Sequence, residues 1–336
     1  MTVREIAEIA GVSPAAVSLV INPRSGVSDD TRQRITRVME EYGYVPSTHK
    51  KGPANFRLML IKYRAHGIAL EENQGFIASI IDRIESECRR FGYDLIMCNC
   101  EAQSAETTLR TLMEGHPDGI IFIGTELQEA NYGLLSHLNA PLCVLDNNLL
   151  LENIDTVVMA NRELTARLVR YLYDLGHREI GYFKFSQNVN NTDERYEGYL
   201  SELKRLGLPA PSPILVKPTV DGAYEDMCSL LRSGFVPRGA IIADNDTVAI
   251  GAMKAINEAG YRIPDDVSIV GFDDIPFSAV TMPALTTMRM SRSQMGTLAV
   301  DLIRKRIKHP DWPAIHMLIG GRLIIRGSTR AMGKEG

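Results

Sequence analysis

Several polar and charged side chains stand where apolar runs of the sequence end. Short apolar runs separated by stretches with helical spacing are typical of a parallel β-sheet covered by helices. The carboxyl ends of parallel strands meet at one edge of such a sheet, where ligands bind. The sequence places the following side chains at or just past these ends: Lys62, Arg64, Asp146, Lys184, Asn245, Asp246, Asp273 and Asp274. Carboxylates, amides and cations at one edge suit a site for a small polar molecule.

Arg195 is a further candidate, because it opens a helix after the polar loop of residues 186–194. Its planar guanidinium can donate to two oxygens of a polyol at once. A surface ion pair is the competing role for Arg195. Asp246 also has two interpretations, since it can enter the ligand site or cap the helix that follows. We take Asn245 as the polar contact beside it.

Three cations at expected strand ends suggest the charge of the ligand. Lys62 and Arg64 close the first expected strand, and Lys184 closes a later one. If all three side chains face the site, they favour an anionic ligand such as a uronic acid or a sugar phosphate.

No catalytic constellation is recognisable in the sequence. A catalytic role for Asp273 and Asp274 would need a nucleophile or a metal, and the GxGxxG, GxxxxGK[ST], GxSxG and HExxH patterns are absent. The five cysteines are an odd set without a CxxC pair, so we interpret them as buried reduced thiols. The pair Cys98 and Cys100 leaves a metal or redox site as the alternative. We expect a protein that is not an enzyme and holds neither cofactor nor metal.

Length and composition fit a small module joined to a larger, divided domain. The chain has 336 residues, of which 45% are apolar and 23% charged, as in ordinary globular proteins. It begins with charged residues rather than the apolar stretch of a secretory signal, and no apolar run approaches the roughly 20 residues of a membrane span. A cytoplasmic protein is expected. The net charge of −4 gives no sign of nucleic-acid binding, so any basic surface must be local.

The larger domain is expected to hold two α/β lobes with a cleft between them. Strands are predicted at residues 58–63, 93–98, 119–124, 142–146, 180–185, 240–243 and 267–272. Closing segments near residues 285–289 and 316–326 are expected to cross between the lobes. The predicted lobes are residues 58–157 with 285–315, and residues 158–284 with 316–330.

The first fifty residues carry the start and stop signals of three short helices. Thr2 and Glu5 have the spacing of a capping box, Ile6, Ile9 and Ala10 form an apolar stripe, and Gly11 ends the first helix. Ser13 caps a second helix with Pro14 at its first position. In the second helix Val17, Val20 and Ile21 point inward, while Ala15, Ser18, Leu19 and Asn22 point outward. Ser28 caps the third helix, whose inward residues are Ile35, Val38, Met39 and Tyr42.

Two helices joined by a tight turn and closed by a third form a helix-turn-helix, a DNA-reading motif, although a three-helix docking module is the alternative. Residues 3–7, 10–22, 27–32 and 42–46 closely resemble the headpiece of the lactose-repressor (LacI/GalR) family. The resemblance continues through residues 92–95, 117–121, 175–178, 195–199, 245–251, 263–267, 271–274 and 283–287, so it covers nearly the whole chain. It implies a helix-turn-helix headpiece (residues 1–46) and a two-lobed, periplasmic-binding-protein-like α/β domain.

The resemblance also implies where DNA would be contacted. Base edges would be read by Pro14, Ala15, Ala16 and Leu19. Contacts to phosphates would come from Ser13, Ser18, Asn22, Arg24, Ser28, Thr31 and Arg32, and Thr2 is a further residue expected to contact DNA. The reading positions lack the Arg, Gln or Asn that bonds bidentately to G or A. We therefore expect Ala15 and Leu19 to touch thymine methyl groups, with phosphate contacts and DNA shape contributing specificity.

For the ligand, the resemblance implies that Asp273 is aimed at hydroxyl groups. It also implies that Phe76, in the segment where relatives carry Asn-Pro-Phe, is an apolar platform, with core packing as the competing role. Residues 47–57 form the linker, and they lack the Ala-Arg-x-Leu hinge helix and the minor-groove leucine of relatives. A homodimer on a near-palindromic operator is implied.

The chain is thus expected to be a transcriptional regulator, most simply a repressor, whose operator affinity depends on a sugar or sugar derivative. The alternatives are a cytosolic sugar sensor with little specific DNA binding, a stand-alone solute-binding protein and an enzyme.

Overall fold

The chain folds into two compact units, and a computed structural model describes residues 3–21, 26–41, 56–67, 75–149 and 152–332. The first unit is essentially Met1–Ala54, and the second comprises Asn55–Arg89 with Tyr93–Gly336. No helix within the described ranges is long and apolar enough to cross a membrane.

The described residues of the first unit form the helices α1 (Val3–Ala10), α2 (Pro14–Ile21) and α3 (Asp29–Glu41). Their shared core consists of Ile6, Ala7, Ala10, Val17, Ile35 and Val38. The predicted caps form, since the Ser13 and Ser28 hydroxyls accept the backbone N–H groups of Ala16 and Thr31 at 3.2 and 3.3 Å. One predicted core residue is wrong, because Ile9 is 48% exposed. The expected cap Thr2 and the inward Tyr42 lie outside the described residues.

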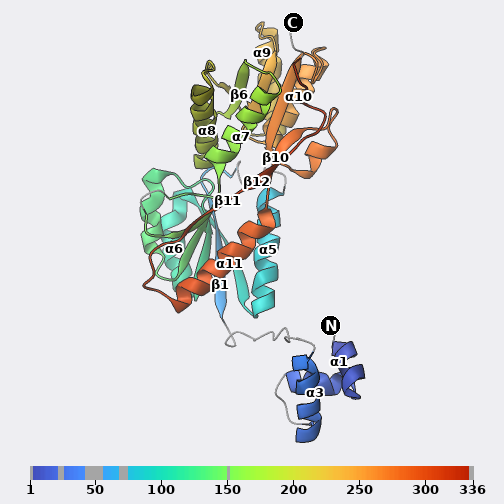
Figure 1. Ribbon diagram of the computed structural model, residues 1–336. Helices are drawn as coiled ribbons and strands as arrows, with labels where there is room; N and C mark the ends of the chain where they lie inside the picture. The colour runs from blue at the N-terminus through green and yellow to red at the C-terminus, as the bar shows by residue number, and fades with distance from the viewer. Residues whose placement is uncertain (1–2, 22–25, 42–55, 68–74, 150–151, 333–336) are drawn as a thin grey trace. The chain divides into compact units, whose positions relative to one another are not determined.

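The second unit contains two six-stranded sheets (Figure 1). The first has the order β11-β5-β4-β3-β1-β2 and is parallel throughout. Its strands, in chain order, are β1 (Arg57–Arg64), β2 (Asp94–Glu101), β3 (Gly119–Ile123), β4 (Leu142–Leu145), β5 (Asp155–Met159) and β11 (His316–Ile319).

The second sheet has the order β12-β10-β9-β8-β6-β7, and only β12 runs antiparallel to its neighbour. Its strands are β6 (Ile180–Phe185), β7 (Ile214–Val216), β8 (Gly239–Ala243), β9 (Val267–Asp273), β10 (Thr286–Met290) and β12 (Gly321–Ile324). We call the part built on the first sheet the first lobe, and the part built on the second sheet the second lobe.

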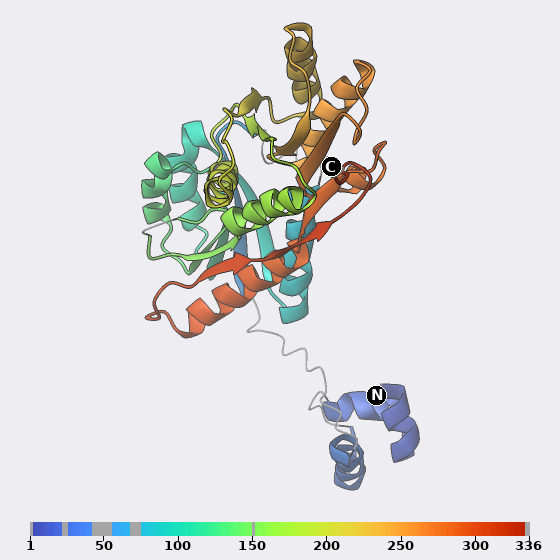
Figure 2. The same cartoon turned by 45° about the horizontal axis from the view of Figure 1, so that its top comes forward.

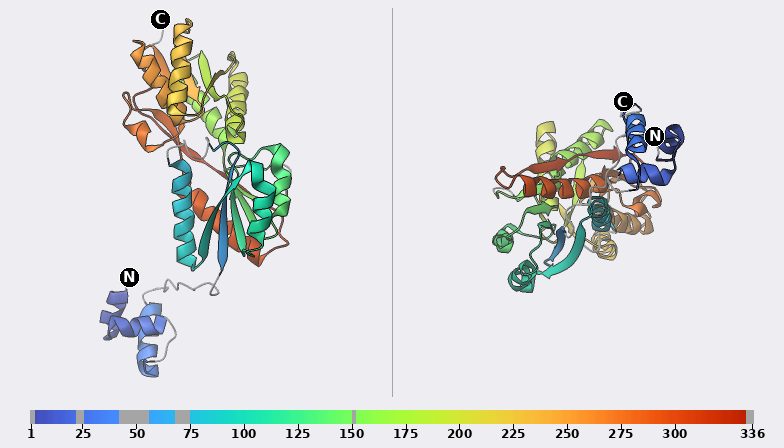
Figure 3. Two further views of the ribbon diagram at one scale, coloured as in Figure 1. Left: turned by 180° about the vertical axis from the view of Figure 1, so that it is seen from behind. Right: turned by 90° about the horizontal axis from the view of Figure 1, so that it is seen from below.

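Helices cover both faces of each sheet (Figures 2 and 3). In the first lobe α5 (Phe76–Phe91) and α11 (Arg292–Lys308) lie on one face, and α6 (Ala105–Met113) with the short 3-10 helix η2 (Glu129–His137) lies on the other. In the second lobe α9 (Val220–Arg232) and α10 (Asp246–Glu258) cover one face, and α7 (Asn161–Asp174) and α8 (Asn190–Leu206) cover the other. The remaining short 3-10 helices are η1 (Ala102–Ser104) and η3 (Pro276–Ala279).

All seven predicted strands are present, but β5 and β7 were not predicted. The segments that cross between lobes also divide differently from the expectation. Thr286–Met290 was expected in the first lobe and pairs with β9 in the second, whereas His316–Ile319 was expected in the second lobe and pairs with β5 in the first. These strands are short, and the pairing partner that fixes their sheet is distant in sequence.

The five cysteines are free thiols, as expected, and Cys98 and Cys228 are only partly buried. Burial, with a contribution from the charge of Glu101, raises the pKa of Cys100 to about 11, so this thiol is unreactive. Within the described ranges no cluster of three or more metal-ligating side chains occurs.

Helices α7 and α8 pack closely because residue 198 is a glycine. A Cβ at Gly198 would lie 2.2 Å from the carbonyl oxygen of Arg162, which is backbone and cannot swing away.

We predict that Gly198→Ala lowers the free energy of unfolding by about 1–3 kcal/mol, because the two helices must move apart. Urea denaturation would measure the loss. Ser201→Ala, an exposed change on the same helix, is the matched control and should be neutral or slightly stabilising. Equal stability of Gly198→Ala and wild type would contradict the close packing.

Candidate functional site

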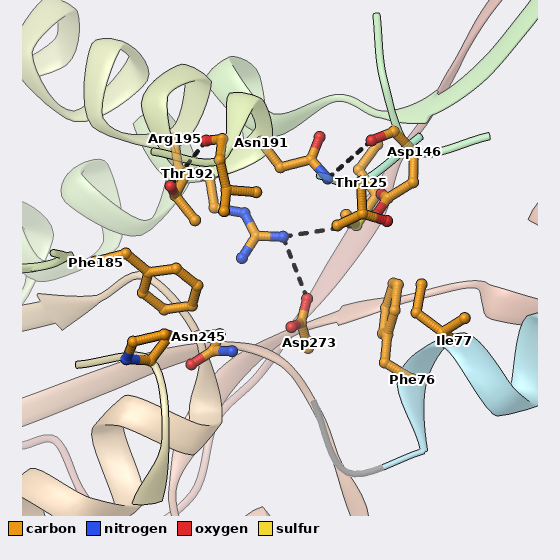
Figure 4. Close-up of a pocket in the computed structure, with 13 residues that line it drawn as sticks. Phe76, Ile77, Thr125, Asp146, Phe185, Asn191, Thr192, Arg195, Asn245 and Asp273 are labelled. Atoms are coloured by element: carbon orange, nitrogen blue, oxygen red, sulfur yellow. Dashed lines mark hydrogen bonds and ion pairs between the residues drawn. The ribbon is translucent and has the colours of Figure 1, made fainter. Parts of the chain in front are cut away.

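A small polar cavity lies between the lobes at the carboxyl ends of strands from both sheets (Figure 4). The first lobe contributes Phe76, Ile77, Thr125, Asp146 and Met159. The second contributes Phe185, Val189, Asn191, Thr192, Arg195, Pro218, Asn245 and Asp273. Its free volume of about 30 Å³, counted as space for the centres of water-sized spheres, leaves room for little more than water. Ligand pockets measure roughly 300–1,000 Å³, so the cavity is far smaller than a usual ligand site in this arrangement of the lobes.

Arg195 occupies the centre of this cavity and is only 4% exposed. Its Nε donates to Asn161 Oδ1 at 3.0 Å, its Nη1 donates to the backbone carbonyl of Asp244, and its Nη2 lies 3.4 Å from Asp273 Oδ1. The guanidinium carbon lies 3.9 Å from the centre of the Phe272 ring. Arg195 is therefore not part of a surface ion pair, and Asp273 balances its buried charge.

Asp146 and Asp273 supply the two carboxylates that line the cavity. Both have positive φ angles, +64° and +108°, which are unusual for residues other than glycine and often occur at binding sites. The Thr125 hydroxyl donates to Asp146 Oδ2 at 2.7 Å, while Asp146 Oδ1 has no hydrogen-bond partner in the described part of the chain. Burial raises the pKa of Asp146 to about 6.

Asn245 takes both roles that were weighed for Asp246, and Asp246 takes neither. Asn245 is the helix cap, since its Oδ1 accepts the backbone N–H of Val248 at 3.0 Å, and it also lines the cavity. Asp246 instead lies beneath the cavity and accepts the Ile275 N–H and the hydroxyls of Ser278 and Thr287. Burial raises the pKa of Asp246 to about 7.

The three predicted cations do not line the cavity. Arg64 lies 3.4 Å from Glu101, Lys184 pairs with Asp193 at 2.6 Å, and Lys62 is a half-buried residue of β1. The expectation was wrong because position near a strand end does not fix which face a side chain occupies, and successive residues alternate. Since these cations do not line the cavity, the prediction of an anionic ligand there has no support.

Phe76 is 1% exposed and lines the cavity as the first residue of α5, so its packing is confirmed and its role as a platform for a ring stays a prediction. The lining residues that were not predicted are Ile77, Thr125, Met159, Phe185, Val189, Asn191, Thr192 and Pro218. Asn191 carried a usable signal, because it precedes Arg195 by four residues and so shares its helix face.

The headpiece presents much of the predicted reading face to solvent. Pro14, Ala15 and Ser18 are exposed, Ala16 and Leu19 are half-buried, and Val17 is fully buried. The hydroxyls of Ser13, Ser28 and Thr31 take part in capping, with Ser28 and Thr31 2.9 Å apart. Arg32 is half-buried on α3. Thr2, Asn22 and Arg24 lie outside the described residues, so their DNA contacts stay predictions.

Comparison with known proteins assigns both units. Residues 2–47 match the bacterial regulatory proteins of the lacI family, and residues 169–329 match a periplasmic binding protein-like domain. The transcriptional repressor PurR of Haemophilus influenzae (strain PittEE) is 30% identical over 320 residues, 92% of each chain. This chain belongs to the lacI family.

Other relatives agree with the assignment. PurR of Mannheimia succiniciproducens is 29% identical over 335 residues and 98% of each chain. The lac repressor dimer bound to operator and the anti-inducer ONPF has a TM-score of 0.74 at 25% identity, covering 98% of this chain and 99% of that one. The CelR–cellobiose complex shares the fold, with a TM-score of 0.70 at 23% identity and the same coverage. This lacI-family member is a DNA-binding transcriptional repressor, as are its relatives, and not an enzyme.

Three buried carboxyl groups are expected to make the stability of this lacI-family repressor depend on pH. Burial raises the pKa values of Asp146 and Asp244 to about 6 and that of Asp246 to about 7, above the value near 4 in an unfolded chain. At pH values above about 4 and below these raised pKa values, the three carboxyl groups are protonated in the native state and ionised in the unfolded chain.

We predict that the free energy of unfolding falls as the pH rises from about 4 to about 7. Urea denaturation across this range would measure the slope. Asp246→Asn should flatten the upper part of the profile, because it removes the group with the highest of these pKa values. An exposed control, Asp265→Asn, should leave the slope unchanged. A profile that is equally steep in both variants would contradict the assignment.

Proposed function

We propose that this repressor is a cytoplasmic homodimer whose affinity for a near-palindromic operator is set by a neutral carbohydrate bound between the lobes. The observation that carries the ligand class is the charge arrangement in the cavity. One buried arginine faces two lining carboxylates, so an anionic ligand would add negative charge next to Asp146 and Asp273. A neutral polyol would add no negative charge next to these carboxylates.

The lining groups complement hydroxyls and a ring. Asp146 Oδ1 is an acceptor for a ligand hydroxyl, and Asn191 and Thr192 add polar groups beside it. Phe76 and Phe185 offer apolar surfaces on opposite sides of Arg195 (Figure 4). Two proteins of similar fold were solved with sugars, CelR with cellobiose and a LacI-family regulator of Enterococcus faecium with ribose. The similarity of their folds to that of this protein supports a carbohydrate as the ligand of the cavity.

Exposed apolar residues on the second lobe support the proposal that the protein is a homodimer. Phe277, Val280 and Met282 are 56, 75 and 89% exposed, and Phe277 and Val280 line a groove with Val220 and Ile250. Adjacent exposed apolar residues of this size are typical of protein interfaces. Two copies would also supply two reading helices, since one short helix contacts only half of a near-palindromic site.

The effector is best tested with Asp146→Asn. We expect neutral mono- or disaccharides to raise the melting temperature of the wild type, and the variant to bind the responding sugar about tenfold more weakly, since it loses one charge-assisted hydrogen bond. The variant should remain folded, because asparagine tolerates the positive φ and removes a buried charge. Calorimetry would give both affinities.

Asp265→Asn, a change of an exposed carboxylate, should bind that sugar like the wild type. Tighter binding of sugar phosphates, uronic acids or free nucleobases than of any neutral sugar would overturn the proposed ligand class.

The DNA-reading face is best tested with Leu19→Ala. Leu19 is proposed to contact thymine methyl groups, so the variant should bind the operator about tenfold more weakly while its binding to random DNA is unchanged. Fluorescence anisotropy at several salt concentrations would separate the two kinds of binding.

Thr36→Ala, an exposed change on α3, is the control. An operator with only one half-site should bind the wild type much more weakly than the full site. G·C pairs beneath α2, or equal losses on operator and random DNA, would contradict the methyl contacts.

A further inference from the structure

We propose that a groove at the junction of the lobes, distinct from the effector cavity, binds a phosphate group or another polyvalent anion. The groove measures about 570 Å³ and lies where the chain passes between lobes, at the end of β10, the start of α11 and the turn between β11 and β12 (Figure 1). Three arginines line it, Arg289, Arg292 and Arg322, and Asp274 is the one carboxylate in its lining.

Two of these arginines face each other directly. Arg289 and Arg322 are partners in the antiparallel pairing of β10 with β12, so their side chains leave the same face of the sheet. Like charges in such a pair are destabilising unless a counter-charge lies between them. Arg322 is exposed and makes no ion pair within the described ranges.

The nearby carboxylate does not supply this counter-charge in full. Asp274 pairs with Arg289 and, at 2.6 Å, with Arg326. Burial alone would raise the pKa of Asp274, but the hydrogen bonds and charges of these two arginines lower it below its usual value, so the carboxylate is ionised. The groove lining thus holds three arginines and one carboxylate, and this carboxylate is shared with Arg326 outside the groove, so the groove keeps a surplus of positive charge.

Further donors converge on the same place. Arg292 lies at the first position of α11, where the first-turn N–H groups have no acceptor within the helix. The Ser291 hydroxyl beside it makes no capping hydrogen bond. Arg167 reaches the turn from α7 and donates to the Gly321 carbonyl at 3.4 Å. Arginine forks and backbone N–H groups match the geometry of phosphate oxygens.

An anion bound in the groove would be coupled to the effector site through Arg292. Arg292 donates to the backbone carbonyls of Asp273 and Asp274, at the end of the strand whose carboxylate pairs with Arg195. An anion in the groove would tie β10, α11 and the β11–β12 turn together, and these segments connect the lobes. Its binding should therefore change effector affinity, since any ligand that favours one lobe arrangement is linked to every other such ligand.

The test uses the full-length protein with inorganic phosphate, pyrophosphate and a nucleoside diphosphate as separate probes. Each is added at millimolar concentration against sodium chloride of matched ionic strength, and binding is followed by thermal shift and calorimetry. The wild type should be stabilised, most by the probes of higher charge. Arg322→Gln should bind them about tenfold more weakly, having lost one charge-assisted contact. Stabilisation by the nucleotide alone would point to a nucleotide rather than to free phosphate as the source.

Arg232→Gln, which changes an exposed arginine on α9 that contacts only Ser229 among the described residues, should respond like the wild type. Arg322 has no ion pair to lose in the described structure, so its variant is expected to fold normally. Equal responses of the wild type and Arg322→Gln, or no response of either, would overturn the proposed site. Neither result would touch the carbohydrate proposal, whose readout is sugar binding by Asp146→Asn.

Discussion

A buried guanidinium organises the larger unit of this protein. Burying a charge is costly unless it is paired and hydrogen-bonded, so the chain around Arg195 must deliver several acceptors to one point. They come from Asn161 at the start of α7, from the carbonyl of Asp244 after β8 and from Asp273 at the end of β9. The parallel pairing of β6, β8 and β9 brings their carboxyl ends to one edge of the sheet, where the acceptors that Arg195 needs and the polar lining of the cavity lie together.

Side-chain amides supply several of the hydrogen bonds between the two lobes. Gln128 donates to the carbonyl of Asn188 at 2.7 Å, and Asn190 donates to the carbonyl of Leu127 and to the Tyr132 hydroxyl. Asn148 and Asn191 make two further contacts between the lobes. Water can replace each such bond, and each contributes only about 0.5–1.5 kcal/mol. Contacts of this kind can be exchanged for contacts with water if the lobes part.

The headpiece is stabilised by its own core and its own helix caps. Its six-residue core is small, and the caps at Ser13 and Ser28 fix where α2 and α3 begin. Those caps let α2 turn Val17 inward and leave Ala15 and Ser18 exposed. Because this exposed face has few polar side chains, specificity for DNA has to come largely from apolar contacts, phosphates and the shape of the duplex.

The sequence by itself determined the local elements of both units. Caps, glycine stops and apolar periodicity depend on residues within a few positions of one another, so helices α1 to α3 and the seven predicted strands followed from short-range patterns. It also identified Arg195, Asp273, Asp146 and Phe76, because each stands at the end of an element or in a motif of the family.

Tertiary structure alone decided which sheet a short strand joins and which face a side chain occupies. β10 and β11 exchanged lobes relative to the expectation, since their pairing partners are distant in sequence. Lys62, Arg64 and Lys184 were assigned to the cavity from strand ends, but the twist and pairing of each strand turned them elsewhere. Asn245 caps α10, while the carboxylate of Asp246 accepts the hydroxyls of Ser278 and Thr287 from distant segments. Such choices depend on contacts between distant segments, which form only when the chain is folded.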